Sequence, residues 1–202
     1  MLQEARDLGF LGPGPGEAHL DHAAGFAEVL RGLEERTARL RRAADLGSGA
    51  GLPGLPLALA FPDCVWLLVE SSVRRAAFLR HAVSQLEVGA RVEVAEARAE
   101  AVGRAPARRG RFDLVVARSF GPPAVVAECG APLLRVSGRA VISEPPGGAP
   151  SRWPAPGLAE LGMAPEVATL AQGSAYQVLR QEEPCSDRYP RRIGIPAKRP
   201  LF

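Results

Sequence analysis

The sequence predicts an α/β fold: a seven-stranded, mostly parallel sheet with helices on both faces. Three observations carry this prediction. Short apolar runs alternate with helical patterns, which favours parallel strands joined by right-handed crossovers. A glycine-rich stretch, DLGSGAGLPG at 45–54, lies between an apolar run and an apolar helix. Two late runs, 166–170 and 176–180, flank a short turn and predict a closing antiparallel pair, which makes the sheet mixed.

Length and composition limit the class of protein. A chain of 202 residues with 47% hydrophobic residues is large enough for one well-buried domain with a small appendage. We divide it into an N-terminal helical extension, 1–40, and a main domain, 41–202. No apolar run approaches the roughly 20 residues that span a bilayer, and the N-terminus is too polar for a signal peptide. We therefore expect a cytoplasmic protein with no membrane partner.

The net charge permits a nucleic-acid partner, and the cysteine content gives no sign of disulfides or of a zinc site. The net charge is +3 and the pI is about 9.1, which permits a nucleic-acid partner. Lys198 is the only lysine among 25 basic residues, a skew typical of genomic base composition, so arginine clusters are weaker evidence for RNA here. The three cysteines are scattered without a C-x-x-C pair, which predicts neither a disulfide framework nor a zinc site.

The N-terminal region predicts two helices, 2–8 and 17–33, separated by the breaker GPGPG at 12–16. His19 and His22 have the spacing of a metal-binding pair on one helical side. No third ligand follows nearby, so we interpret both as imidazoles on the helix surface and expect no metal.

The glycine-rich stretch predicts a strand over 43–46, a tight loop and a helix over 55–60. Gly47, Gly49 and Gly51 allow a close approach of the backbone to a ligand, since they carry no Cβ. Pro53 suits a first helical position, where its missing N–H costs nothing. In an open α/β sheet, ligands bind at such strand-to-helix turns.

Two nucleotide ligands compete for this loop, and an ordinary glycine turn is the third alternative. Gly49, Gly51 and Gly54 satisfy the dinucleotide pattern G-x-G-x-x-G. Asp45 favours S-adenosylmethionine instead, because a carboxylate repels a pyrophosphate but suits an ammonium. Glu70 ends the next apolar run, 19 residues after Gly51, at the spacing of an acid that binds ribose hydroxyls. Both ligands carry that ribose, so Glu70 does not separate them.

The remaining elements follow in order. We expect strands over 65–69, 91–95, 112–117 and 139–143, helices over 73–86 and 124–134, and a helical turn over 158–161. Gly138 is expected to cap the second of these helices, and 104–111, 144–148 and 150–156 are expected to be irregular. The segments 98–100 and 118–123 follow strands and so lie at the ligand edge.

Several motifs together resemble one family. They are the glycine stretch with its LPGLP continuation, VESSVRRAAFLR at 69–80, RAE at 98–100, VAR at 116–118 and the tail YPRRIGIPAKRP at 189–200. The chain from about residue 17 onward resembles the bacterial small-subunit (16S) ribosomal RNA guanine-N7 methyltransferases, the glucose-inhibited division protein B family.

This resemblance implies a Rossmann-like class I methyltransferase fold and S-adenosylmethionine as cofactor. It implies cofactor contacts at Gly47, Leu52, Ala99, Glu100 and Arg118. Arg118 serves either the carboxylate of the donor or an RNA phosphate, with a structural ion pair as the alternative.

The resemblance also implies ribosomal RNA or the small ribosomal subunit as partner. The basic tail, with Arg191, Arg192, Lys198 and Arg199, is a candidate RNA contact, or else a solvated basic end.

The chemistry of the acceptor is consistent with this family. Guanine N7 has a free lone pair and loses no proton, so it needs no general base, and we name no catalytic residue. Adenine amines are usually served by an Asn/Asp-Pro-Pro-Tyr/Phe motif, whereas RSFGPP stands at 118–123. Glu144 stands where the family carries a cation, and residues 1–30 lack its N-terminal patterns. A different RNA or small-molecule acceptor is therefore one alternative, and a nucleotide-binding module, NAD-dependent or without catalysis, is the other.

Overall fold

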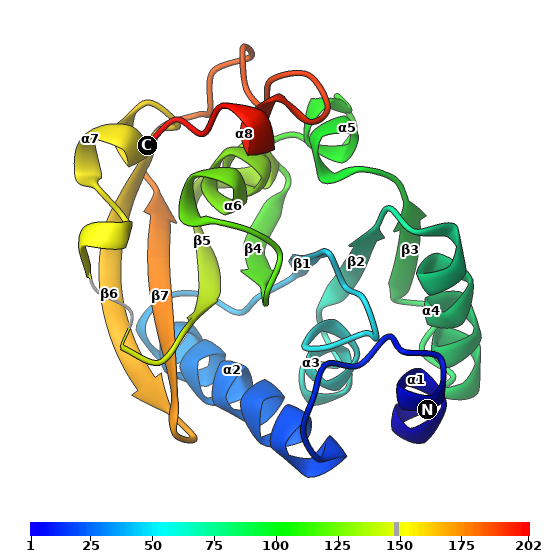
Figure 1. The fold of residues 1–202 in the computed structure, drawn as a ribbon. Helices are drawn as coiled ribbons and strands as arrows, with labels where there is room; N and C mark the ends of the chain where they lie inside the picture. The colour runs from blue at the N-terminus through cyan, green and yellow to red at the C-terminus, as the bar shows by residue number, and fades with distance from the viewer. Residues whose placement is uncertain (148–149) are drawn as a thin grey trace.

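The fold is a single seven-stranded mixed sheet between two layers of helices (Figure 1). The computed structural model describes residues 1–147 and 150–202. Gly148, at the end of the expected irregular segment 144–148, lies outside these residues. The sheet order is β3-β2-β1-β4-β5-β7-β6. The predicted antiparallel pair forms as β6 and β7, and β7 is antiparallel to β5 as well. The strands are β1 (Arg42–Leu46), β2 (Val65–Glu70), β3 (Val92–Glu96), β4 (Phe112–Ala117), β5 (Leu134–Glu144), β6 (Met163–Ala171) and β7 (Ser174–Gln181).

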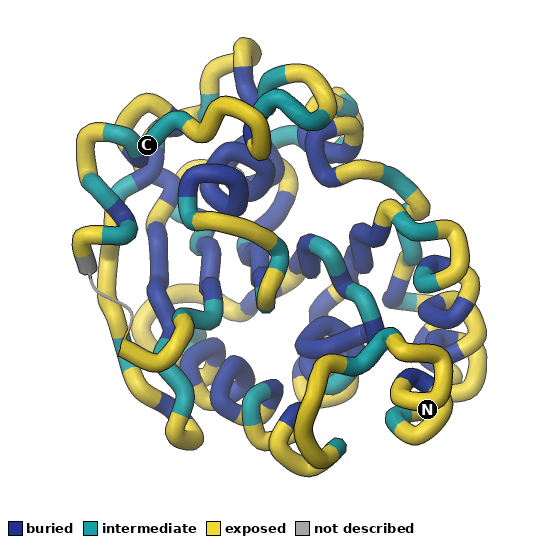
Figure 2. Tube along the Cα trace, in the orientation of Figure 1, coloured by how far each residue is buried: buried dark blue, intermediate teal, exposed yellow. Residues whose placement is uncertain are grey.

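The helices form two hydrophobic cores, one on each face of the sheet. One face carries α2 (Gly16–Arg36), α3 (Gly54–Ala60) and α4 (Val73–Gln85); the other carries α5 (Ala99–Arg104), α6 (Pro123–Gly130) and α7 (Ala155–Ala159). The short α1 (Leu2–Asp7) packs near α4, and α8 (Ile195–Lys198) packs on α6. The central strands β1, β2 and β4 are largely buried, whereas the edge strand β6 is mostly exposed (Figure 2).

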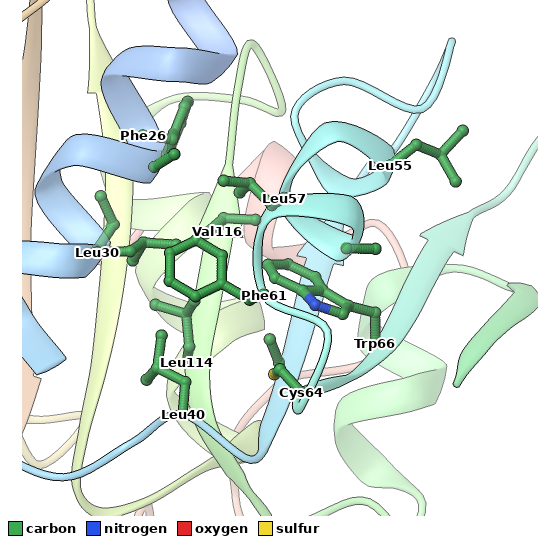
Figure 3. Close-up of a cluster of buried hydrophobic side chains, with 14 of the residues drawn as sticks. Phe26, Leu30, Leu40, Leu55, Leu57, Phe61, Cys64, Trp66, Leu114 and Val116 are labelled. Carbon is green, nitrogen blue, oxygen red and sulfur yellow. The ribbon is translucent and has the colours of Figure 1, made fainter. Parts of the chain in front are cut away.

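Helix α2 is packed against the sheet. Phe26 and Leu30 lie in the same apolar cluster as Leu57 of α3 and Leu114 of β4 (Figure 3). A helix with one apolar stripe must bury it, and the first face of the sheet offers that surface. The second helix of the predicted extension, 1–40, is thus continuous with the core of the sheet.

The strand register brings three predicted segments together. Leu46 pairs with Val69 of β2 and with Ala117 of β4, so the three strands end side by side. The residues that follow these ends are the glycine loop, Glu70 and Arg118. The carboxyl edge of the sheet therefore collects the candidate site, as the fold requires.

The predicted helix over 124–134 is confirmed for 124–130, but its predicted end was wrong. Helix α6 ends at Gly130, a 3-10 turn covers 131–133, and β5 begins at Leu134. Gly138 lies inside β5 and caps no helix. A Cβ there would stand 2.8 Å from the carbonyl oxygen of Arg135 and 3.0 Å from that of Phe112, so close backbone packing at an irregularity in the β4–β5 pairing requires glycine.

The other boundaries agree within a few residues, except that the expected turn at 158–161 forms earlier, as α7. Within the described ranges, no helix combines the length and apolarity needed to cross a membrane.

Candidate active site

The glycine loop is a close-fitting turn at the carboxyl end of β1. Gly47, Gly49 and Gly51 all have positive φ, at 68°, 55° and 85°. A Cβ on Gly47 would lie 2.6 Å from Cδ2 of Phe120, in the loop after β4. The loop therefore needs glycine both for its backbone conformation and for its contact with the neighbouring strand end.

Glu70 ties the glycine loop to the end of β2. Its Oε2 accepts a hydrogen bond from the amide of Gly49 at 3.0 Å, and its Oε1 accepts one from the amide of Ser72 at 2.8 Å. The side chain is buried, yet it borders a cavity. Each carboxylate oxygen has two lone pairs, so capacity remains for hydroxyl donors from a ligand.

Two cavities open on this edge of the sheet, and seven of the nine predicted cofactor residues are divided between them. The Glu70 cavity, about 280 Å³, is lined by Gly47, Glu70, Arg75, Ala99, Glu100, Ser119 and Phe120 among others. The Arg118 cavity, about 270 Å³, is lined by Gly47, Gly49, Leu52, Arg75, Arg118, Ser119, His19 and residues 10–12 among others. Gly51 packs beneath the loop, where a Cβ would stand 2.4 Å from Cδ1 of Leu55. Gly47, Arg75 and Ser119 border both cavities, so the two form one extended site.

Asp45 lies beneath the loop and borders neither cavity. It is 1% exposed, and its Oδ2 accepts a hydrogen bond from the amide of Gly54 at 3.2 Å. Its Oδ1 has no partner among the described residues. Burial raises the pKa of Asp45 to about 7. The direct contact with the ammonium of a donor, predicted from sequence, finds no support in this geometry; the carboxylate instead braces the start of α3.

Glu100 is positioned by the C-terminal tail. The side chain is 3% exposed, and its Oε1 accepts hydrogen bonds from the amide of Gly194 at 2.9 Å and from Arg98 at 3.3 Å. Burial alone would raise the pKa of Glu100, but these hydrogen bonds lower it below its usual value. The carboxylate is thus held ionised at the wall of the Glu70 cavity, next to Ala99.

Arg118 reaches toward the N-terminal helix. Its Nη2 lies 2.7 Å from Nδ1 of His19, and no ion pair joins Arg118 to an acid in the described ranges. Burial lowers the pKa of Arg118, while Tyr176 and Asp45 act in the opposite direction. The structural ion pair considered from sequence is therefore not found. His19 is 6% exposed, so its interpretation as a surface imidazole was wrong.

The tail packs back onto the domain through Arg191. Its guanidinium donates to both carboxylate oxygens of Glu128, at 2.9 and 2.6 Å, and its amide donates at 2.8 Å. Glu128 is 0% exposed. Arg191 is thus an anchor of the tail, and the RNA contact expected of it stays a prediction. Arg192, Lys198 and Arg199 are exposed.

The negative charge of Glu144 is paired with a positive charge within the fold. Its carboxylate forms an ion pair with Arg152 and accepts a hydrogen bond from Nε1 of Trp153 at 2.9 Å. The negative charge that departs from the family pattern is therefore compensated by a neighbour, which weakens the argument for a different acceptor.

Sequence reasoning missed several residues of the site. Arg75 and Ser119 border both cavities, and Ala197 of the tail borders the Glu70 cavity. Arg75 and Ser119 lie in segments already associated with the site, 69–80 and 118–123. Phe10 is distant from Arg75 in the sequence, but the guanidinium of Arg75 lies 5.8 Å from the centroid of its ring. No local sequence pattern indicates this contact.

A larger cavity lies away from this chemistry. It has a volume of about 410 Å³ and is lined by Arg42, Val65 and residues 89–93 at the amino edge of the sheet. We place the functional site at the carboxyl edge, because the glycine loop and the buried carboxylates converge there.

Comparison with solved structures supports the fold. The structure of the O-methyltransferase TomG from Streptomyces achromogenes in complex with SAM aligns with a TM-score of 0.61 and 16% identity, covering 90% of this chain and 89% of that one. The structure of PigF with SAH aligns with a TM-score of 0.59 and 18% identity, covering 82% of this chain and 56% of that one. The architecture is that of class I methyltransferases.

Comparison of sequences identifies the family. The family model for rRNA small subunit methyltransferase G matches residues 19–144. The ribosomal RNA small subunit methyltransferase G of Rubrobacter xylanophilus is 37% identical over 195 residues, covering 90% of this chain and 72% of the relative. The ribosomal RNA small subunit methyltransferase G of Roseiflexus castenholzii is 39% identical over 167 residues, covering 80% of this chain and 71% of the relative. The chain therefore belongs to the rRNA small subunit methyltransferase G family.

Proposed function

We propose that this protein transfers a methyl group from S-adenosylmethionine to N7 of a guanine in 16S ribosomal RNA, in the cytoplasm. The observation that carries the proposal is the convergence of the glycine loop, Glu70 and Arg118 on one extended cavity, in a chain of this family. The alternative of a nucleotide-binding module has no comparable support, since it rests on the glycine spacing alone.

The residues present fit S-adenosylmethionine. Glu70 lines the cavity with both oxygens fixed by backbone amides, which suits it to accept hydrogen bonds from ribose hydroxyls. Ala99 and the ionised Glu100 border the same cavity, and we assign them to the adenine end of the donor. Gly47 borders both cavities, and a Cβ there would collide with Phe120, so the backbone of the loop itself forms this part of the wall. The donor supplies an activated methyl group: the S–CH₃ bond breaks, the N7–CH₃ bond forms, and sulfur retains the bonding electron pair.

The acceptor side fits a base that loses no proton. No carboxylate and no cysteine is found among the described residues that border the Arg118 cavity. Cys129 borders the Glu70 cavity, but burial raises the pKa of its thiol far above its usual value, so it stays protonated and is a poor nucleophile. What the protein contributes is alignment of donor and acceptor and exclusion of water, which account for much of the catalysis in a displacement of this kind.

Basic side chains flank the extended site. Arg75 borders both cavities, and Lys198 follows directly on Ala197 at the Glu70 cavity. We assign phosphate contacts to Arg192, Lys198 and Arg199, which are exposed on the tail. Replacing Arg192 and Lys198 with alanine should weaken RNA binding and reduce the slope of log K against log salt by about one for each lost phosphate contact.

The test is an in vitro reaction with donor carrying a labelled methyl group. Small ribosomal subunits from a strain lacking the modification are the substrate, and the RNA is then digested to nucleosides. We expect the label in 7-methylguanosine. Label in another nucleoside would overturn the acceptor assignment, and no label in subunits that a known enzyme can methylate would overturn the activity.

A further inference from the structure

We propose that His19 is a positioning residue, whose neutral imidazole holds the guanidinium of Arg118 at the cavity so that its positive charge stays available to an anionic group. This inference rests on the proposed function and deepens it. The anionic group is a carboxylate or phosphate oxygen, supplied by the donor or by RNA.

The hydrogen-bond partners of His19 specify its protonation state. Nε2 lies 3.2 Å from the carbonyl oxygen of Gly12, which can only accept, so Nε2 carries the proton. Nδ1 lies 2.7 Å from Nη2 of Arg118, which can only donate, so Nδ1 carries the lone pair. Both contacts together require the neutral imidazole with its proton on Nε2.

The imidazole fixes the arginine without neutralising it. A partly buried guanidinium is usually paired with a carboxylate, as Arg191 is with Glu128. Within the described part of the chain, Arg118 has no such pair, and both it and His19 border the Arg118 cavity. Asp45 attracts it electrostatically but forms no hydrogen bond with it in these ranges. The site thus presents an oriented positive charge without a counterion.

The arrangement joins distant parts of the chain. His19 lies in the first turn of α2, 99 residues before Arg118. Gly12 belongs to the segment 10–12 that borders the same cavity. The N-terminal region therefore sets the orientation of an arginine that follows β4, which gives residues 1–20 a direct effect on ligand affinity.

Three substitutions at one position separate orientation from charge. His19→Asn keeps a neutral acceptor near the position of Nδ1. His19→Phe keeps the ring but removes the acceptor. His19→Asp keeps an acceptor and adds a negative charge that neutralises Arg118. Each variant is measured for its free energy of unfolding, its Kd for S-adenosylhomocysteine, and its kcat and KM with small ribosomal subunits.

We expect His19→Asn to stay within about threefold of the wild type, and His19→Phe and His19→Asp to weaken one constant by roughly tenfold, the scale of a lost hydrogen bond to a charged group. A weaker Kd for S-adenosylhomocysteine identifies the carboxylate of the donor; a higher KM for the subunits identifies an RNA phosphate. In an Arg118→Ala background, His19→Phe should have no further effect on that constant.

Two results would overturn the proposal. Either all three variants retain wild-type constants whatever their stability, or His19→Asp behaves like His19→Asn. In both cases an active wild type leaves the proposed function intact. A wild-type protein that neither binds S-adenosylhomocysteine nor methylates RNA would instead overturn the proposed function together with this inference.

Discussion

Asp45 at the end of β1 accepts a hydrogen bond from the amide of Gly54, the first residue of α3, with an O···N distance of 3.2 Å. This bond spans the glycine loop from below and joins the strand to the helix that follows. The other oxygen of the carboxylate is buried without a partner in the described structure. The loop is therefore stabilised from below by Asp45, whose side chain is buried in the folded protein.

The first prediction concerns the pH dependence of stability. The pKa of Asp45 is raised to about 7 in the folded protein, so the folded state binds more protons than the unfolded state between about pH 4 and 7. This contribution to stability is fully present below pH 4 and is lost as the pH rises through 7. Between pH 4 and 8, Asp45→Asn should therefore gain ~2–4 kcal/mol relative to wild type.

Urea unfolding of both proteins at pH 4 and pH 8 checks this prediction. The comparison uses the change with pH, so a constant cost of placing the amide cancels. Equal differences at the two pH values would show that the carboxylate is not protonated in the folded protein.

A second prediction concerns Gly54. A Cβ at this position would stand 2.5 Å from Cδ2 of Leu68 and 2.6 Å from Oδ2 of Asp45. Gly54→Ala should therefore destabilise the protein by ~1–3 kcal/mol through overpacking. Gly89→Ala is the control, because the nearest atom to its Cβ is Cγ1 of Val83 at 3.8 Å. A similar free energy of unfolding for both variants would contradict the close packing of α3 on β2.

A third prediction tests whether α2 belongs to the core. A Cβ on Gly25 would lie 2.2 Å from Oη of Tyr176, whereas one on Gly32 in the same helix would meet nothing within 4 Å. Gly25→Ala should cost ~2–4 kcal/mol, since it displaces a tyrosine hydroxyl that donates to the carbonyl oxygen of His22. Gly32→Ala should gain about 0.5–1 kcal/mol through higher helix propensity. Thermal unfolding of both variants checks this prediction. A small gain in stability for both variants would show that α2 does not unfold together with the core.

A fourth prediction concerns the buried pair of Glu128 and Arg191. Arg191→Ala leaves a fully buried carboxylate without its partner and should cost ~3–5 kcal/mol. Arg192→Ala, on the exposed neighbouring side chain, should change stability by less than about 0.5 kcal/mol. The double variant Glu128→Leu, Arg191→Met should recover most of the loss, because it removes the charge as well as its partner. Denaturant unfolding of all three checks this; equal losses for Arg191→Ala and Arg192→Ala would mean that the tail is not anchored as observed.

Local patterns were sufficient for the fold and for the loop that organises the site. The central strands β2 and β4 are nearly continuous apolar runs, and the glycine spacing with a terminal acid, Glu70, indicates a nucleoside site before any contact is known. These features depend on neighbours in sequence, which is why they could be predicted. The end of α6 was missed because the apolar pattern continues through residues 131–134, although Gly130 and Pro132 together are a typical signal for the end of a helix.

The missed parts of the site depend on contacts between distant segments. From its position in the helical pattern, His19 was expected on the helix surface. Only the contact with Arg118, which lies 99 residues later, shows that it belongs to the cavity wall. Arg191 is one of several arginines in a basic tail, and only Glu128 distinguishes it. Asp45 was predicted to contact the donor from its place in the chain, but the side chain turns toward α3 instead.

The most direct test of the account is calorimetric binding of S-adenosylhomocysteine to the wild type, Glu70→Ala and Glu70→Gln. We expect one site in the wild type and at least roughly tenfold weaker binding in Glu70→Ala. Glu70→Gln should be intermediate, because its amide oxygen can still accept from Gly49 but the charge is lost. Unchanged circular dichroism spectra would show that the fold is retained. Absence of binding to the wild type, or equal affinity in all three folded proteins, would contradict the assignment of the donor site.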